Sequence, residues 1–179
     1  MTKRHKVFVS YHHANDQHYR DAFEKLLTHT NDVMVSRSVQ IGDIDPNLKT
    51  ETVRQKIRDE YLRDSTVTVV LIGTQTWQRK HVDWEIASSV RNTTLNPRSG
   101  VLGILLPTYP TPKTYNKHTI PPRLWDNVEA GYAEVIAWST DAQSLQDAIH
   151  RAFQRRMTHQ PTSSRKLFAK NRSGEKWTP

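Results

Sequence analysis

The residues best suited to chemistry are one glutamate and one short polar stretch. Glu85 lies in a Val-Asp-Trp-Glu-Ile segment (82–86), and Ser10, Tyr11 and His12 follow a short apolar run. On a helix, Glu85 falls about 100° from the centre of the apolar face of its segment. A carboxylate on that flank can enter a pocket and stabilise positive charge that develops in a reaction. The alternative is an ordinary acid of a first helical turn, favoured there by the helix dipole.

Other kinds of site leave little trace in the sequence. There is no Walker loop, no G-x-G-x-x-G and no G-x-S-x-G. The absence of cysteine excludes disulfides, a cysteine nucleophile and a thiolate metal site. His12 and His13 are adjacent and lack the spacing of metal ligands, so no metal site is predicted. Asp45, in a polar loop, is a further candidate for contact with a ligand.

The positive charge is concentrated at the end of the chain. Residues 151–179 hold eight Lys and Arg against one acid, whereas residues 1–150 hold eighteen against seventeen. A nucleic-acid-binding protein would be expected to carry a basic face on its folded part, so nucleic acid is not an expected partner. We therefore expect one domain over residues 1–157 and a flexible basic tail over residues 158–179.

Apolar runs alternate with amphipathic helical segments through this domain, which predicts an α/β fold around a parallel sheet. Five strands suit a flavodoxin-like three-layer sandwich with strand order 2-1-3-4-5. Pro107–Tyr132 interrupts the alternation, and connections of that length are usually lids, partner surfaces or disordered. The predicted strands are residues 6–11, 33–35, 67–72, 101–106 and 133–138, and the predicted helices are about 16–29, 51–63, 80–92 and 141–157.

The expected fold indicates where a site should lie. Open α/β sheets bind ligands at the carboxyl ends of their strands, where the strand order reverses. In the order 2-1-3-4-5 that point lies between the first and third strands, at the loops 10–15 and 73–80. The second loop leads into the helix that carries Glu85. The topology therefore predicts that Ser10, Tyr11, His12 and Glu85 surround one crevice.

Two stretches of the chain resemble a known family. Residues 7–11, Val-Phe-Val-Ser-Tyr, resemble the opening F-[IV]-S-[YF] strand of TIR domains. Residues 57–86, with Ser65, the strand 67–72, Gly73, Trp77 and the Val-Asp-Trp-Glu-Ile segment, resemble the TIR-like proteins of bacterial Thoeris antiphage defence. The polar residues 78–81 depart from the small residues usual before that segment.

This resemblance implies a cytoplasmic enzyme that cleaves NAD, with Glu85 as its catalytic residue. NAD is the substrate, and no cofactor is implied. The product would be an ADP-ribose-derived nucleotide, such as a cyclic isomer, that activates a separate effector protein. Assembly into a homo-oligomer on activation is also implied, and no membrane partner is.

The resemblance also suggests contacts to the substrate. Tyr11 or Trp84 could stack on a flat ring, and Ser10, His12 or Asp45 could contact ribose or phosphate. A competing reading is a TIR-like adaptor that acts only through protein–protein assembly. The acid at position 85, which adaptors often lack, favours the enzyme.

Overall fold

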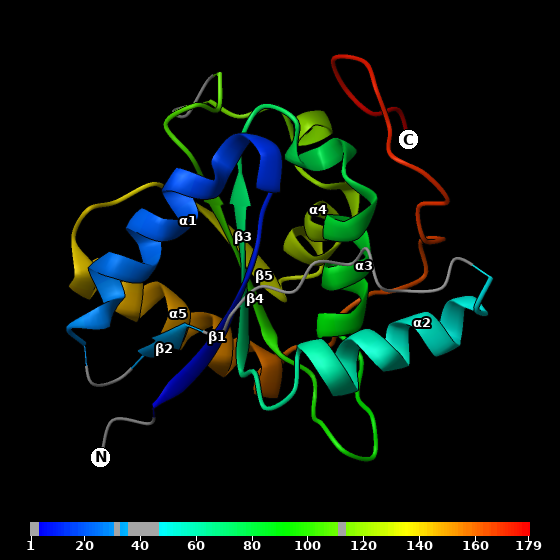
Figure 1. Ribbon diagram of the computed structural model, residues 1–179, viewed down its shortest axis with the longest axis horizontal. Helices are drawn as coiled ribbons and strands as arrows, with labels where there is room; N and C mark the ends of the chain where they lie inside the picture. The colour runs from blue at the N-terminus through cyan, green and yellow to red at the C-terminus, as the bar shows by residue number, and fades with distance from the viewer. Residues whose placement is uncertain (1–3, 31–32, 36–46, 111–113) are drawn as a thin grey trace.

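The computed structural model describes residues 4–30, 33–35, 47–110 and 114–179. Among these residues, five parallel strands form one sheet in the order β2-β1-β3-β4-β5, with helices on both faces (Figure 1). The predicted α/β fold with a parallel sheet is confirmed. The strands are β1 (His5–Ser10), β2 (Val33–Val35), β3 (Val67–Ile72), β4 (Gly100–Leu105) and β5 (Ala133–Ala137).

The helices form two layers, one on each face of the sheet (Figure 1). On one face lie α1 (His13–Thr28) and α5 (Ala142–Thr158). The other face carries α3 (Lys80–Ser89), α4 (Pro122–Glu129), and α2 (Thr50–Lys56) with its π-helical continuation η2 (Ile57–Tyr61). Two 3₁₀ turns, η3 (Thr76–Gln78) and η4 (Lys117–Thr119), complete the elements. No helix in the described part of the chain is both long enough and apolar enough to cross a bilayer.

The central strands hold the two layers together. Every residue of β3 and β4 is buried, as expected for parallel strands covered on both faces. Side chains alternate between the faces. Val69 and Leu71 pack in the cluster with α1 and α5, whereas Val70 and Ile72 pack in the cluster with α3 and α4. This alternation fixes which residues at the end of each strand face α3.

Pro107–Tyr132, expected to be a lid, a partner surface or disordered, instead contains η4 and α4. Helix α4 lies between β4 and β5 in the chain, so it is the crossover helix that the sequence pattern missed. Pro122 occupies the first turn of α4, where a proline costs no hydrogen bond, and Leu124 is buried against the sheet. Prolines that looked like loop signals therefore begin a helix. Residues 111–113 lie outside the described residues.

The basic tail does not fit the expectation of a flexible segment. Residues 159–179, called the C-terminal strap below, run back along α4 and α3 (orange to red in Figure 1). Phe168 and Trp177 are buried, and the indole of Trp177 donates to the carbonyl of Ile120 at 2.7 Å. The strap has no helical or strand periodicity because it forms neither element. Two buried aromatic side chains and its hydrogen bonds to the helices hold it in place.

We expect removal of residues 160–179 to lower the melting temperature clearly. Loss of a buried Phe or Trp side chain costs about 3 kcal/mol or more. In a domain of this size, 1 kcal/mol shifts the midpoint by roughly 2–4 °C, so a fall of roughly 6 °C or more should be seen by calorimetry. Removing only the exposed Thr178 and Pro179 is the matched control and should leave the midpoint nearly unchanged. An unchanged midpoint for the longer deletion would contradict the packing of the strap.

Candidate active site at the end of β1

The side chain of Glu85 lies at the carboxyl end of β1. Ser10, the last residue of that strand, donates a hydrogen bond from its hydroxyl to Oε2 of Glu85. Glu85 is 1% exposed and Ser10 is fully buried. The position of Glu85 on the flank of its helix predicted a carboxylate that enters a pocket, and the structure buries this side chain almost completely.

Helix α3 brings Glu85 to this point because it lies across both β1 and β3. Val82 and Ile86 fill the cluster on that face of the sheet. Ser89, one turn after Glu85, bonds the hydroxyl of Thr68 in β3 at 2.7 Å and the carbonyl of Glu85 at 2.7 Å. These contacts fix the helix over β3, so the flank that carries Glu85 covers the end of β1.

Burial changes the acidity of this carboxyl group. Loss of hydration raises the pKa of Glu85 from 4.5 to about 8, and the hydrogen bond from Ser10 acts in the opposite direction. Glu85 is therefore mostly protonated at neutral pH when no cation is near. A carboxyl group in this state can release its proton when a positive charge arrives beside it.

Tyr11 does not lie beside Glu85 as the topology predicted. The side chains of a strand alternate, and Tyr11 packs with α1 and α5 on the opposite face of the sheet from Ser10. Its hydroxyl donates to Oε1 of Gln17 at 2.5 Å, and its ring lies 4.4 Å from that of His13. The contacts of Tyr11 therefore belong to the core and to the start of α1.

His12 precedes α1 and is 8% exposed. Burial, followed by the positive charge of Arg79, lowers its pKa to about 4, so its ring is neutral. Within the described residues its Nδ1 has no hydrogen-bond partner. A neutral imidazole with a free ring nitrogen beside the loop of β1 can bind a ligand hydroxyl or phosphate oxygen.

Two further histidines, His13 and His81, lie at the loop that follows β1. Nε2 of His81 lies 2.9 Å from the carbonyl oxygen of Tyr11, and the rings of His13 and His81 are 5.0 Å apart. Burial lowers the pKa of both rings. These contacts join the loop after β1 to the first turn of α3. In the described part of the chain, no group of three His, Cys, Asp or Glu side chains could hold a metal ion.

Asp16 is a buried acid that the sequence analysis missed. It is 2% exposed in the first turns of α1, and burial raises its pKa. Its carboxylate lies against Gly73 at the end of β3, where a Cβ atom would come 2.5 Å from Oδ2. The neighbouring Asn15 donates to Oε1 of Gln75 at 3.2 Å. Gly73 is therefore needed for the close approach of α1 to β3, and its place directly after β3 was the available signal.

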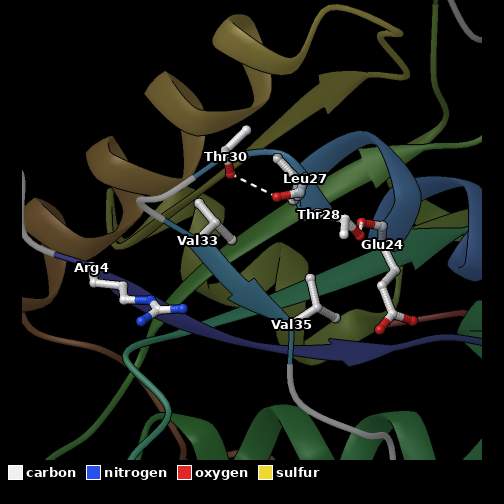
Figure 2. Close-up of a pocket in the computed structure, with 7 residues that line it drawn as sticks. All are labelled: Arg4, Glu24, Leu27, Thr28, Thr30, Val33 and Val35. Carbon is white, nitrogen blue, oxygen red and sulfur yellow. Dashed lines mark hydrogen bonds between the residues drawn. The ribbon is translucent and has the colours of Figure 1, made fainter.

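A cavity of about 270 Å³ lies elsewhere on the molecule. It is lined by Arg4, Glu24, Leu27, Thr28, Thr30, Val33 and Val35 (Figure 2). Arg4 directly precedes β1 and Val33 begins β2, so this cavity lies toward the amino ends of the strands. It is therefore separate from Ser10 and Glu85, which lie at the carboxyl end of β1 and against it.

A comparison with known families agrees with this geometry. The family model described as Thoeris protein ThsB, TIR-like domain, matches residues 8–111, which is more than half of the chain. The chain belongs to this Thoeris TIR-like family. The matched range starts in β1 and extends past β4, so it includes both Ser10 and Glu85. No curated protein matches the chain.

In this Thoeris TIR-like domain, Trp84 does not join Ser10 and Glu85 as the sequence analysis expected of a ligand contact. Its ring packs against the cluster of Phe8 and α2, and Lys80 lies over it at 4.8 Å. Its indole N–H donates to the carbonyl of Phe168 in the C-terminal strap at 2.9 Å. The neighbour of Trp84 is thus the strap. Asp45, the remaining candidate, lies outside the described residues.

The pH dependence of stability tests the buried state of Glu85. Between about pH 5 and 8 the folded chain keeps the Glu85 proton, which the unfolded chain has lost. The free energy of unfolding should therefore fall as pH rises through this window, by up to about 1.4 kcal/mol per pH unit from this group. Glu85→Gln keeps a neutral side chain beside Ser10 and removes this contribution.

Urea denaturation at several pH values checks this expectation. The stability of Glu85→Gln relative to wild type should increase steadily with pH. Glu60 is exposed, so Glu60→Gln is the matched control and should follow the wild-type curve. Parallel curves for wild type and Glu85→Gln would show that Glu85 titrates as an ordinary surface acid.

Proposed function

We propose that this Thoeris TIR-like domain cleaves the nicotinamide glycosidic bond of NAD, with Glu85 as the catalytic residue. The product would be an ADP-ribose-derived nucleotide, such as a cyclic isomer, that activates a separate effector in antiphage defence. Membership of the Thoeris family supports the role in defence. The observation that carries the proposal is the fully buried carboxyl group of Glu85, held by Ser10 where the strand order reverses.

The chemistry requires only one carboxylate. Nicotinamide in NAD is already a cationic leaving group, so it departs without a proton from a general acid. Glycosidases with two carboxylates use the second mainly to protonate a poor leaving group. As the bond breaks, positive charge moves onto the ribose, and an oriented carboxylate beside it stabilises the oxocarbenium-like transition state.

The raised pKa of Glu85 fits this mechanism when the substrate is considered. A positive charge within about 4–6 Å lowers the pKa of a carboxyl group by roughly 1–3 units. From about 8, the pKa of Glu85 would fall to near neutrality or below when the nicotinamide cation is bound. Glu85 would thus become an anion only beside the substrate. Without substrate, Glu85 would stay neutral, which avoids the free-energy cost of a buried, unpaired carboxylate.

Neighbouring groups would then contact the rest of the substrate. Ser10 would orient the carboxylate through its hydrogen bond. His12, neutral and with a free ring nitrogen among the described residues, is suited to a ribose hydroxyl or a phosphate oxygen. Asp45 stays a candidate for the same substrate. Tyr11 and Trp84 are less suited to stacking on a ring, because Tyr11 packs on the opposite face and Trp84 packs under the strap.

An adaptor would bind other proteins through a surface away from Glu85. A cavity of about 530 Å³ lies between α1 and the loop after β5, and it is lined by Tyr19, Leu26, Trp138 and the neighbouring His18, Ala22, Lys25, His29 and Thr140. Such a partly apolar hollow suits a contact with another protein. An adaptor would need this surface and would not need the charge of Glu85. The two functions are therefore separated by one substitution.

We expect Glu85→Gln to reduce nicotinamide release by on the order of 10²-fold or more, because the amide cannot stabilise a ribosyl cation. Nicotinamide and NAD should be measured by mass spectrometry in phage-challenged cells that express wild type, Glu85→Gln or the surface control Glu60→Gln. Wild type and the control should consume NAD equally. Protection from phage by Glu85→Gln without nicotinamide release would instead support an adaptor.

A further inference from the structure

The C-terminal strap binds the same helix that carries Glu85. Its residues contact Gln78, Lys80, Asp83 and Trp84, which surround the start of α3. Glu85 is the next residue in the chain, and it faces β1 on the inner side. Helix α3 is thus held between β1, through Glu85, and the strap, through the residues that precede Glu85.

The strap supplies a cap that α3 lacks. Arg79 is the N-cap residue and its side chain makes no capping hydrogen bond. Instead, Oδ1 of Asn171 accepts a hydrogen bond from the amide of Lys80, the first residue of α3, at 2.9 Å. The next amide of the strap, that of Arg172, donates to the carbonyl of Gln78 at 2.8 Å. The free amides at a helix start need such an acceptor, and here it comes from a residue 91 positions away.

One turn further along, a buried ion pair fixes the strap to α3 and α4. Arg123 of α4 donates to Oδ1 of Asp83 at 2.9 Å, and both side chains are at most 2% exposed. Oδ2 of Asp83 also accepts from the amide of Phe168 at 2.9 Å. Arg123 donates in addition to the carbonyl of Lys166 at 3.1 Å. The strap provides two hydrogen bonds to this buried pair, so its removal would leave charged atoms of both side chains without these partners.

The strap is anchored independently on α4 and η4. Arg165 makes two hydrogen bonds to Asp126, at 2.7 and 2.8 Å. The side chain of Asn127 accepts from the amide of Thr162 and donates to its carbonyl, both at 3.0 Å. Trp177 stacks on His118, with ring centres 4.6 Å apart. These anchors lie on both sides of residues 166–172. They therefore fix the position of this segment against α3.

We propose that the C-terminal strap positions Glu85 for its reaction, with Asn171 and Phe168 as positioning residues that fix the start of α3. This inference rests on the proposed function of Glu85. Neither residue contacts Glu85 itself, and they act through Lys80, Asp83 and Trp84. A displacement of about 1 Å in a catalytic group can cost on the order of 10²-fold in rate, so a small movement of this helix matters to the reaction.

Asn171 is the residue to test, because it is exposed and its replacement leaves the core intact. Asn171→Ala removes the cap from Lys80, whereas Asn171→Asp keeps an acceptor and adds a charge that a helix start favours. Asn92→Ala is the matched control. It also removes an Asn side chain that accepts from a backbone amide, that of Arg98 at 2.8 Å, in the loop after the other end of α3.

Amide hydrogen exchange and nicotinamide release should be measured on the full-length chain and these variants. In Asn171→Ala, exchange of the amides from Lys80 to Glu85 should accelerate about tenfold or more relative to Asn92→Ala. The kcat should fall about tenfold with KM nearly unchanged, since the cap affects the orientation of a catalytic group. Asn171→Asp should restore both quantities.

Equal exchange of these amides in Asn171→Ala and Asn92→Ala would overturn the proposal. So would a normal kcat in Asn171→Ala despite faster exchange, because the helix start could then loosen without consequence for Glu85. A wild-type chain without NAD turnover counts against the proposed function instead. The exchange measurement alone then decides whether the strap fixes the start of α3.

Discussion

The carboxyl group of Glu85 is held out of water against the hydroxyl of Ser10, at the end of β1. Several features of the fold are needed to bring these two side chains together. Helix α3 must lie across β1 and β3, which Val82, Ile86 and Ser89 ensure from its inner side. Its outer side is covered by α4 and the C-terminal strap. A carboxyl group is thus enclosed by elements that are far apart in the chain.

Burying a carboxylate has a large free-energy cost because the charge loses its hydration. The protein avoids most of this cost because the buried group stays protonated. A pKa of about 8 means that the empty site holds a neutral acid at neutral pH. The same burial strengthens attraction to a cation, because little water is present to screen it. On the proposed function, the substrate supplies that cation in its nicotinamide ring. Under that proposal, burial would link the ionisation of Glu85 to the presence of substrate.

Much of this arrangement could be predicted from the sequence, because it depends on local patterns and on a general rule of α/β topology. Continuous β-branched runs such as 67–72 indicated buried parallel strands, and the strand-end rule indicated that Ser10 and Glu85 lie close together. The depth of Glu85 could not be predicted, since it depends on how α3 crosses the sheet. Tyr11 was placed in the crevice, although strand alternation directs it to the opposite face.

The C-terminal strap escaped prediction for a different reason. Periodicity identifies helices and strands, and the strap is neither, so no periodic pattern indicated that Phe168 and Trp177 are buried. Its contacts are also of long range, as between Asn171 and Lys80. Helix α4 was not predicted because the segment Pro107–Tyr132 interrupts the alternation of strands and helices; Pro122, in its first turn, is nevertheless compatible with a helix start.

The titration of Glu85 itself tests the central claim most directly. The carboxyl carbon of ¹³C-labelled glutamate can be followed by NMR in the empty chain and with NAD bound, with Glu85→Gln used to assign the signal. If Glu85 is buried as described, the midpoint should lie near pH 8 without NAD and should be lower by roughly 1–3 units with NAD bound. A midpoint near 4.5 in both states would show that Glu85 is neither buried in solution nor sensitive to the substrate cation.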